Sequence, residues 1–140
     1  MDSHDGGFTL VELLVVIVVL GVLVAIAIPV FLAQRDIGYR SSLRSDLRNA
    51  AIGVETAAVR HADAGGPDFP GHYGWIAPGV PVQDLPGVAF RPSVGTIRVI
   101  ASVDAAGQDF CLEATDRRLG AAEPWHYRKS GGAPERGACA

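Results

Sequence analysis

The hydrophobic pattern of the chain is dominated by one uninterrupted apolar run near its N-terminus. No charged residue occurs from Leu13 to Ala33, over the stretch LLVVIVVLGVLVAIAIPVFLA. A helix needs about 20 apolar residues to cross a bilayer. A secretory signal peptide would have a basic start and a shorter apolar stretch, whereas this chain begins with MDSHDGG. The pattern therefore predicts a membrane-spanning helix.

The helical pattern continues beyond Gln34 but becomes amphipathic. Apolar residues follow one another at the spacing of one helical face, at Leu43, Leu47, Ala50, Ala51, Val54, Ala57 and Ala58. The opposite face carries Arg44, Arg48, Glu55 and Arg60. Gly65, Gly66 and Pro67 are stop signals just after this stretch. We therefore expect one helix from Phe8 to about Ala62, whose second half, residues 34–63, packs on a sheet.

A loop and a small antiparallel sheet are expected next. The loop, residues 64–95, is rich in Gly and Pro, and we expect Tyr73, Trp75 and Ile76 to anchor it. Residues 96–103 alternate as a strand with one wet face, and DAAG at 104–107 reads as a turn. Strands are then expected at 108–115 and 125–129. The predicted fold class is α+β, with one long N-terminal helix packed on an antiparallel sheet of three or four strands.

Net charge and cysteine usage give limited information on the partners of the chain and on its redox compartment. The formal net charge is −3, which points to no particular partner. Cys111 and Cys139 are too far apart in the sequence for a zinc ribbon or a thioredoxin-type motif. A structural disulfide, which would place the C-terminal half in an oxidising compartment, is the favoured use. It would close the tail onto the second strand.

Glu12 is the one charged residue inside the apolar region. A carboxylate at the centre of a bilayer costs about 2 to 3 kcal/mol, so such a residue usually has a partner. Alternatively, Glu12 lies near the headgroups and reaches water. Position alone leaves both readings open.

The residues around Glu12 carry a resemblance. Gly7-Phe8-Thr9-Leu10-Val11-Glu12-Leu13-Leu14, ahead of an apolar run that contains Gly21 and Pro29, resembles the processing and assembly signal of type IV prepilins and pseudopilins. The resemblance implies cleavage between Gly7 and Phe8 by prepilin peptidase and N-methylation of Phe8. It also implies an assembly role for Glu12, whose carboxylate would pair with the new ammonium group of Phe8 between neighbouring subunits.

The same resemblance implies a division of the chain and a set of partners. Residues 1–7 would be a leader, 8–33 a transmembrane and polymerisation helix, and 34–140 an extracytoplasmic head. The chain would be a single-pass membrane protein in contact with lipid, then a homo-oligomeric helical filament at the cell surface, built with an assembly platform and minor pilins. Gly21 and Pro29 would loosen or kink the packed helix. The segments FCLEAT and WHY with a late Cys also resemble actinobacterial pilins.

Four arginines after the apolar run complicate the orientation. Arg35, Arg40, Arg44 and Arg48 follow it, whereas the leader has no basic residue, so the positive-inside rule would place the head in the cytoplasm. The processing signal and the disulfide favour a head outside, and Asp36 and Asp46 interleave the arginines. Nucleic-acid binding by the stripe of Arg40, Arg44 and Arg48 is disfavoured, because Asp36 and Asp46 dilute it and no aromatic platform for single-stranded bases interleaves it.

An enzyme and a membrane-anchored binding module are alternatives from other classes, and a pseudopilin is an alternative within the pilin-like class. His61, His72 and His126 allow a catalytic triad on paper, but the sequence has no nucleophile elbow, phosphate loop or metal-spaced pair, so no catalytic residue, metal or cofactor is expected. A membrane-anchored binding module would explain the span but not Gly7, Phe8 and Glu12. A secretion or competence pseudopilin is the third alternative, although no acidic loop of the calcium-binding kind is apparent near the C-terminus.

Overall fold

The computed structural model describes residues 7–63, 73–119 and 123–139, apart from the side chain of Ile97. The chain divides into two compact units, Met1–Arg35 and Asp36–Ala140. One helix, α1 (Leu10–Asp63), is followed by the 3₁₀ helix η1 (Val82–Asp84) and the strands β1 (Thr96–Val103) and β2 (Phe110–Asp116). Strand β3 (Trp125–Arg128), the 3₁₀ helix η2 (Lys129–Gly131) and strand β4 (Pro134–Arg136) complete the order. The expected helix and its bounds are confirmed to within two residues.

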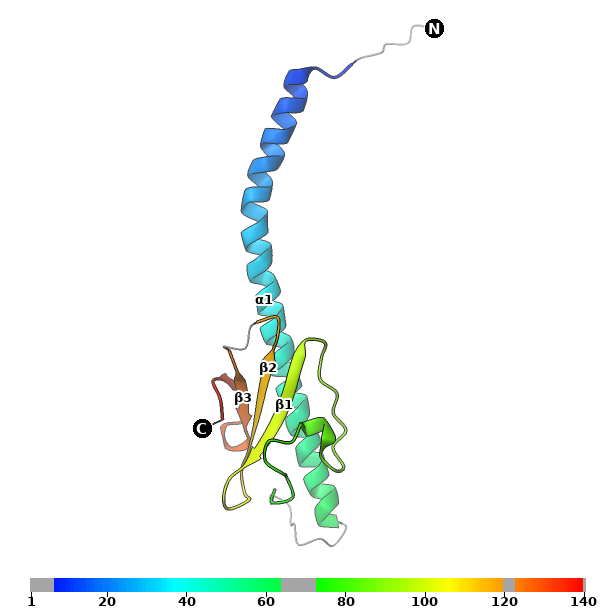
Figure 1. Ribbon diagram of the computed structural model, residues 1–140, viewed down its shortest axis with the longest axis vertical. Helices are drawn as coiled ribbons and strands as arrows, with labels where there is room; N and C mark the ends of the chain where they lie inside the picture. The colour runs from blue at the N-terminus through cyan, green and yellow to red at the C-terminus, as the bar shows by residue number, and fades with distance from the viewer. Residues whose placement is uncertain (1–6, 64–72, 120–122, 140) are drawn as a thin grey trace, which may run out of the picture. The chain divides into compact units, whose positions relative to one another are not determined.

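The four strands form one antiparallel sheet in the order β1-β2-β3-β4, which runs beside the second half of α1 (Figure 1). The predicted turn between β1 and β2 is present. The Asp104 carboxylate accepts hydrogen bonds from the backbone N–H groups of Gln108 and Asp109, at 2.7 and 3.0 Å, and Gly107 adopts a φ of 70°. Those contacts fix the hairpin and therefore the register of Val99 opposite Ala114.

The sequence pattern did not locate β4. Residues Lys129–Gly131 form η2 where the third strand was expected to end, and Gly132 takes a left-handed conformation with a φ of 68°. This conformation, which favours glycine, reverses the chain so that Pro134–Arg136 pairs with β3. Proline is compatible with the position because β4 is the edge of the sheet. The fold therefore has four strands, the upper of the two expected numbers.

The core of the second unit lies between α1 and the inner face of the sheet. The predicted helical stripe is buried in full, and it packs with Val99, Ala101, Phe110, Leu112, Ala114 and Trp125 from the strands. Two of the expected loop anchors, Tyr73 and Ile76, are also buried, and Tyr73 donates a 2.6 Å hydrogen bond to Glu55. The third anchor, Trp75, is half-buried and stacks on His61. The predicted periodicity thus identified most of the core.

Asp46 does not interleave the arginines on the solvent face, as the sequence suggested. It is only 3% exposed and accepts hydrogen bonds from the Ser93 N–H at 2.9 Å, the Ser93 hydroxyl at 2.8 Å and the Thr96 hydroxyl at 2.6 Å. Its spacing from Leu43, Leu47 and Ala50 places it on the buried side of the helix. The carboxylate therefore ties α1 to the segment that enters β1.

The expected disulfide is confirmed. Cys111 of β2 is bonded to Cys139, 28 residues later, and the Cys139 N–H donates a 3.0 Å hydrogen bond to the Glu113 carboxylate. Cys111 and Glu113 alternate with the core residues Phe110, Leu112 and Ala114, so both lie on the outer face of the sheet. The crosslink and the hydrogen bond together hold the tail against β2.

Removal of the disulfide should destabilise the second unit. Closing a loop of this length stabilises a folded protein by about 3 kcal/mol, so C111S/C139S should lower the free energy of unfolding by that amount. Urea unfolding of the full chain in detergent, followed by tryptophan fluorescence, measures it because both tryptophans lie in this unit. Reductant should bring the wild type to the midpoint of the variant and leave the variant unchanged. Equal midpoints for both proteins without reductant would contradict the prediction.

The Asp46 contacts lead to a second stability prediction. Asp46→Ala leaves the buried donors of Ser93 and Thr96 without an acceptor, so we expect a loss of about 2 kcal/mol in the free energy of unfolding. Asp84→Ala is the matched control, because Asp84 is exposed and no described side chain binds its carboxylate. The same urea experiment should show little change for the control. A loss no larger for Asp46→Ala than for Asp84→Ala would refute this role.

Candidate functional site

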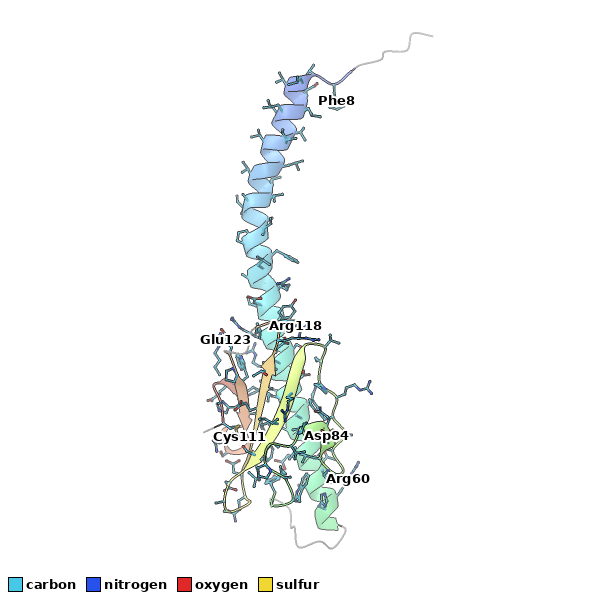
Figure 2. All side chains as sticks on the ribbon, viewed as in Figure 1. Phe8, Arg60, Asp84, Cys111, Arg118 and Glu123 are labelled. Carbon is cyan, nitrogen blue, oxygen red and sulfur yellow. A yellow bond between two sulfur atoms is a disulfide. The ribbon has the colours of Figure 1, made fainter. Side chains whose placement is uncertain are left out.

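The candidate site begins at the residues that precede the helix. Gly7, Phe8 and Thr9 are non-helical, and α1 starts at Leu10. Phe8 is 85% exposed, and Figure 2 labels it just ahead of the helix. Nothing lies within 4 Å of the position that a Cβ atom on Gly7 would occupy. The predicted junction between Gly7 and Phe8 thus lies in exposed, non-helical chain that an enzyme can reach.

Thr9 and Glu12 form a reciprocal cap on the first turn of α1. The Glu12 carboxylate accepts hydrogen bonds from the Thr9 N–H at 2.9 Å and from the Thr9 hydroxyl at 2.8 Å. In return the Glu12 N–H donates to the Thr9 hydroxyl oxygen at 3.2 Å. This arrangement is a capping box, which satisfies two backbone N–H groups that the start of a helix otherwise leaves unpaired. The predicted assembly residue therefore also has a partner within its own chain.

Sequence reasoning missed Thr9, although the signal was available. A threonine followed by a glutamate three residues later, just before an apolar run, is the recognised sequence pattern of a capping box. The hydrogen bonds orient the Glu12 carboxylate before any other copy of the chain is present. One of its two oxygens, Oε1, is not used in the capping contacts. The carboxylate can therefore bind Thr9 and, at the same time, a cationic group from another chain.

The first unit exposes its apolar side chains on every side of the helix. Eighteen large apolar residues between Leu10 and Leu32 are 45% exposed or more. One helix among the described residues is long and apolar enough to cross a membrane, and its most apolar window has a mean hydropathy of 3.3. Gly21 and Pro29 lie inside it, and α1 continues through both, so the predicted loosening there stays a prediction. The segment has the composition of a membrane-spanning helix, and its apolar side chains form no buried core among the described residues.

The remaining candidate residues are not brought together into a site. His61 stacks on Trp75, with ring centroids 4.7 Å apart, and the His126 ring nitrogen Nδ1 is 3.1 Å from the Gly137 carbonyl oxygen. His72 lies outside the described residues. Within the described part of the chain, no group of three or more His, Cys, Asp and Glu side chains is placed to hold a metal ion.

A charged pair with a buried carboxylate has a structural role. Asp116, at the end of β2, is fully buried and accepts hydrogen bonds from the backbone N–H and the guanidinium of Arg118. The Arg118 hydrogen bonds hold the pKa of the Asp116 carboxyl below its usual value, against the opposing effect of burial. The Arg118 guanidinium also lies 4.1 Å from the centre of the Tyr39 ring. The pair therefore ties the chain after β2 to α1.

Comparison with known proteins assigns the N-terminal segment. Residues 2–28 match the model of the prokaryotic N-terminal methylation motif. Comparison with curated proteins finds no match. Among solved structures, the TTHA1221 type IV pilin protein from Thermus thermophilus is similar with a TM-score of 0.44 and 16% identity, over 71% of this chain and 98% of that one.

The assigned motif contains the residues on which the sequence prediction rested, from Gly7 to Glu12, together with Gly21. The motif includes the start of α1, which begins at Leu10 and continues through the apolar run. A four-stranded antiparallel sheet packs on the second half of that helix. The chain therefore carries the prokaryotic N-terminal methylation motif at residues 2–28, on a fold of one long helix and a four-stranded antiparallel sheet.

Proposed function

We propose that the chain is a structural subunit of a type IV pilus filament. Prepilin peptidase cleaves it between Gly7 and Phe8 and methylates the new terminal amine of Phe8. The mature chain is then a single-pass membrane protein whose residues 8–33 span the bilayer. The assembly platform transfers it into the filament. Residues 34–140 form the extracytoplasmic head, where the disulfide is stable. The filament would serve adhesion, motility or DNA uptake.

The observation that carries this proposal is the exposed apolar surface from Leu10 to Leu32, most of which lies within the methylation motif. Burying a large aliphatic side chain is worth about 1.5 to 3 kcal/mol, so eighteen such side chains in water would cost on the order of tens of kcal/mol. A bilayer removes that cost for a single subunit. The same helices packed side by side remove it in a filament. Polymerisation therefore exposes no additional apolar surface, because the helix moves from contact with lipid to contact with other helices.

Glu12 sets the direction in which a subunit moves from lipid into the filament and the axial register in which its helix packs there. Apolar helices that pack on each other have no strong preference for one axial position, and a charge pair supplies one. Cleavage creates an ammonium group on Phe8, and an unpaired charge in an apolar environment is costly. The free oxygen of Glu12 on a neighbouring subunit is the complementary group. The capping contacts with Thr9 use only the other oxygen, so they leave this one available.

The same features fit a secretion or competence pseudopilus and, except for the motif, a membrane-anchored binding module. Mass spectrometry of filaments sheared from the cell surface separates these readings. A chain that begins at N-methylated Phe8 in long surface filaments supports the pilus subunit. A chain found only in membranes that retains Met1 supports the anchored module, and a processed chain absent from surface filaments supports the pseudopilus.

Processing should depend on the side chain at position 7. Gly7→Val places a branched side chain next to the cut bond, so we expect the chain to stay at its precursor mass. The wild type should show the mass of residues 8–140 with one added methyl group, and Gly6→Val is the matched control that should be processed normally. Intact-mass measurement of membrane extracts gives the result. Normal processing of Gly7→Val would exclude the proposed cleavage site.

Assembly should depend on the charge of Glu12 and not on its capping contacts. Glu12→Gln keeps a side chain that can form the capping box but removes the charge, so we expect filament yield to fall at least tenfold while processing continues. Thr9→Ala removes both hydroxyl contacts of the cap, retains the backbone N–H contact and keeps the carboxylate, so its yield should stay near that of the wild type. Sheared filament is quantified against total processed subunit. The reverse order of the two variants would show that Glu12 acts only as a helix cap.

A further inference from the structure

The side chains that join α1 to the start of β3 leave several buried polar atoms without a hydrogen-bond partner. Among the described residues there are four such atoms, and three of them are Arg40 Nε, Glu123 Oε2 and Trp125 Nε1. Arg40 pairs with Glu123, which lies two residues before Trp125, so the three atoms belong to one junction. Buried polar groups are nearly always hydrogen-bonded, so each exception needs a physical explanation. Their concentration at one junction indicates a binding site for a polar group.

Positive charge exceeds negative charge at this junction. The guanidinium carbon of Arg44, one helical turn after Arg40, lies 5.5 Å from the centre of the Trp125 ring. That of Arg136, from β4, lies 5.7 Å from the same ring. Among the described residues, no carboxylate lies within 4 Å of the guanidinium of Arg44 or Arg136. Three guanidinium groups therefore share the junction with one carboxylate, and we call Arg40, Arg44, Glu123, Trp125 and Arg136 the Trp125 cluster.

Glu135, next to Arg136 in β4, does not neutralise the cluster. Neighbouring residues of a strand point to opposite faces of the sheet. Arg136 is paired with Trp125, which belongs to the core, whereas Glu135 is paired with His126. Arg136 therefore lies on the inner face and Glu135 on the outer face. Contact with an aromatic ring attracts a cation but leaves its charge available to an anion, so the excess positive charge remains.

The Trp125 cluster can be reached from solvent, although several of its polar atoms are buried. The side chains of Arg40 and Glu123 are 30% and 38% exposed, and Arg44 and Arg136 are exposed. Trp125 is only 7% exposed, so its N–H lies at the buried end of the cluster. Arginine carries its charge at the end of a long side chain, so the guanidinium groups can turn toward a bound ion. A small ion can therefore enter between the arginines.

The unpartnered atoms define the chemistry of a group that would satisfy them. Arg40 Nε and Trp125 Nε1 are donors, so each needs an oxygen atom that accepts a hydrogen bond. Glu123 Oε2 lies 3.2 Å from Arg40 Nη2, but the hydrogen bond from that nitrogen goes to Oε1, at 3.4 Å. An ionised carboxylate oxygen only accepts, so Glu123 Oε2 needs an O–H or N–H group. With the excess positive charge, the site fits an oxyanion that still carries a proton.

We propose that the Trp125 cluster binds hydrogen phosphate, an oxyanion that keeps one proton at neutral pH. Its unprotonated oxygens accept hydrogen bonds from the guanidinium groups and the indole, and its O–H group donates to Glu123 Oε2. Sulfate has the same charge but no proton, so the Glu123 carboxylate would repel it. A water molecule can bond with the same atoms but does not neutralise the excess charge. The inference goes beyond the proposed filament and depends only on the second unit.

Isothermal titration calorimetry of the full chain in detergent tests the proposal. The probes are sodium phosphate, sodium sulfate and sn-glycerol 3-phosphate, at constant ionic strength. Phosphate should bind roughly tenfold or more tightly than sulfate, because only phosphate can donate to Glu123. A phosphate ester loses its last proton near a pKa of about 6, so glycerol 3-phosphate at about pH 7.5 should bind as weakly as sulfate. Equal affinities for the three probes would show that the site selects charge alone, which contradicts the proposal, as does a wild type that binds no phosphate.

Single variants locate the binding site on the chain. R44Q and R136Q each remove one charged donor, so each should weaken phosphate binding roughly tenfold or more. R60Q is the matched control for the loss of one charge, because Arg60 lies at the other end of the second unit from Glu123 (Figure 2). It should keep the wild-type affinity. A loss in R60Q as large as that in R44Q would overturn the assignment to the Trp125 cluster.

E123Q and W125F test the two kinds of hydrogen bond separately. The amide of E123Q can donate, so sulfate should bind more tightly than to the wild type and the ratio of phosphate to sulfate affinity should fall toward one. W125F keeps an aromatic ring but removes the N–H donor, so phosphate binding should weaken about fivefold. If W125F does not fold, E123Q still decides, because Glu123 is partly exposed. A wild-type affinity ratio in E123Q would refute the proposed contact with the phosphate O–H.

Discussion

The cost of exposing the apolar run between Leu13 and Ala33 to water is the constraint on which the rest of this protein depends. No residue of that run belongs to the core of the second unit, which closes with the stripe that begins at Leu43 and with the sheet. The two units therefore need different surroundings. The second unit is stable through its own core and disulfide, whereas the first reaches a low free energy only in lipid or among other apolar helices.

Most of the fold could be predicted because its signals are periodic. The helical stripe and the β1–β2 hairpin follow from spacings of 3.6 and 2 residues, and both are observed. The strand β4 could not be predicted, because a three-residue strand that contains Pro134 has no period and depends on the reversal at Gly132. Asp46 was misplaced for a related reason. Its charge suggested solvent, but its helical spacing and the donors from Ser93 and Thr96 determine its burial.

The residues of the candidate site that form a contiguous motif could be predicted from the sequence. The proposed partner of Glu12 could not, because a later chemical step would create it. Gly7, Phe8 and Glu12 are contiguous enough to be recognised as a motif, and the matched model covers them. The contact of Thr9 with Glu12 was not predicted, because the charge of Glu12 suggested a partner on another subunit and not a helix cap. In the proposed function, the ammonium group of Phe8 forms only when the chain is cleaved. The precursor therefore displays the Glu12 carboxylate without the cation that we propose as its partner.

The arginines that follow the apolar run raise a question of timing. Counted along the sequence, Arg40 and Arg44 favour a cytoplasmic head under the positive-inside rule. In the folded unit Arg40 is paired with Glu123, 83 residues later in the chain, and Arg44 lies against Trp125. Those contacts do not exist while the chain is being inserted, because their partners are far along the sequence. If the head lies outside the cytoplasm, as the proposed function requires, its insertion opposes the positive-inside rule while these arginines are still unpaired.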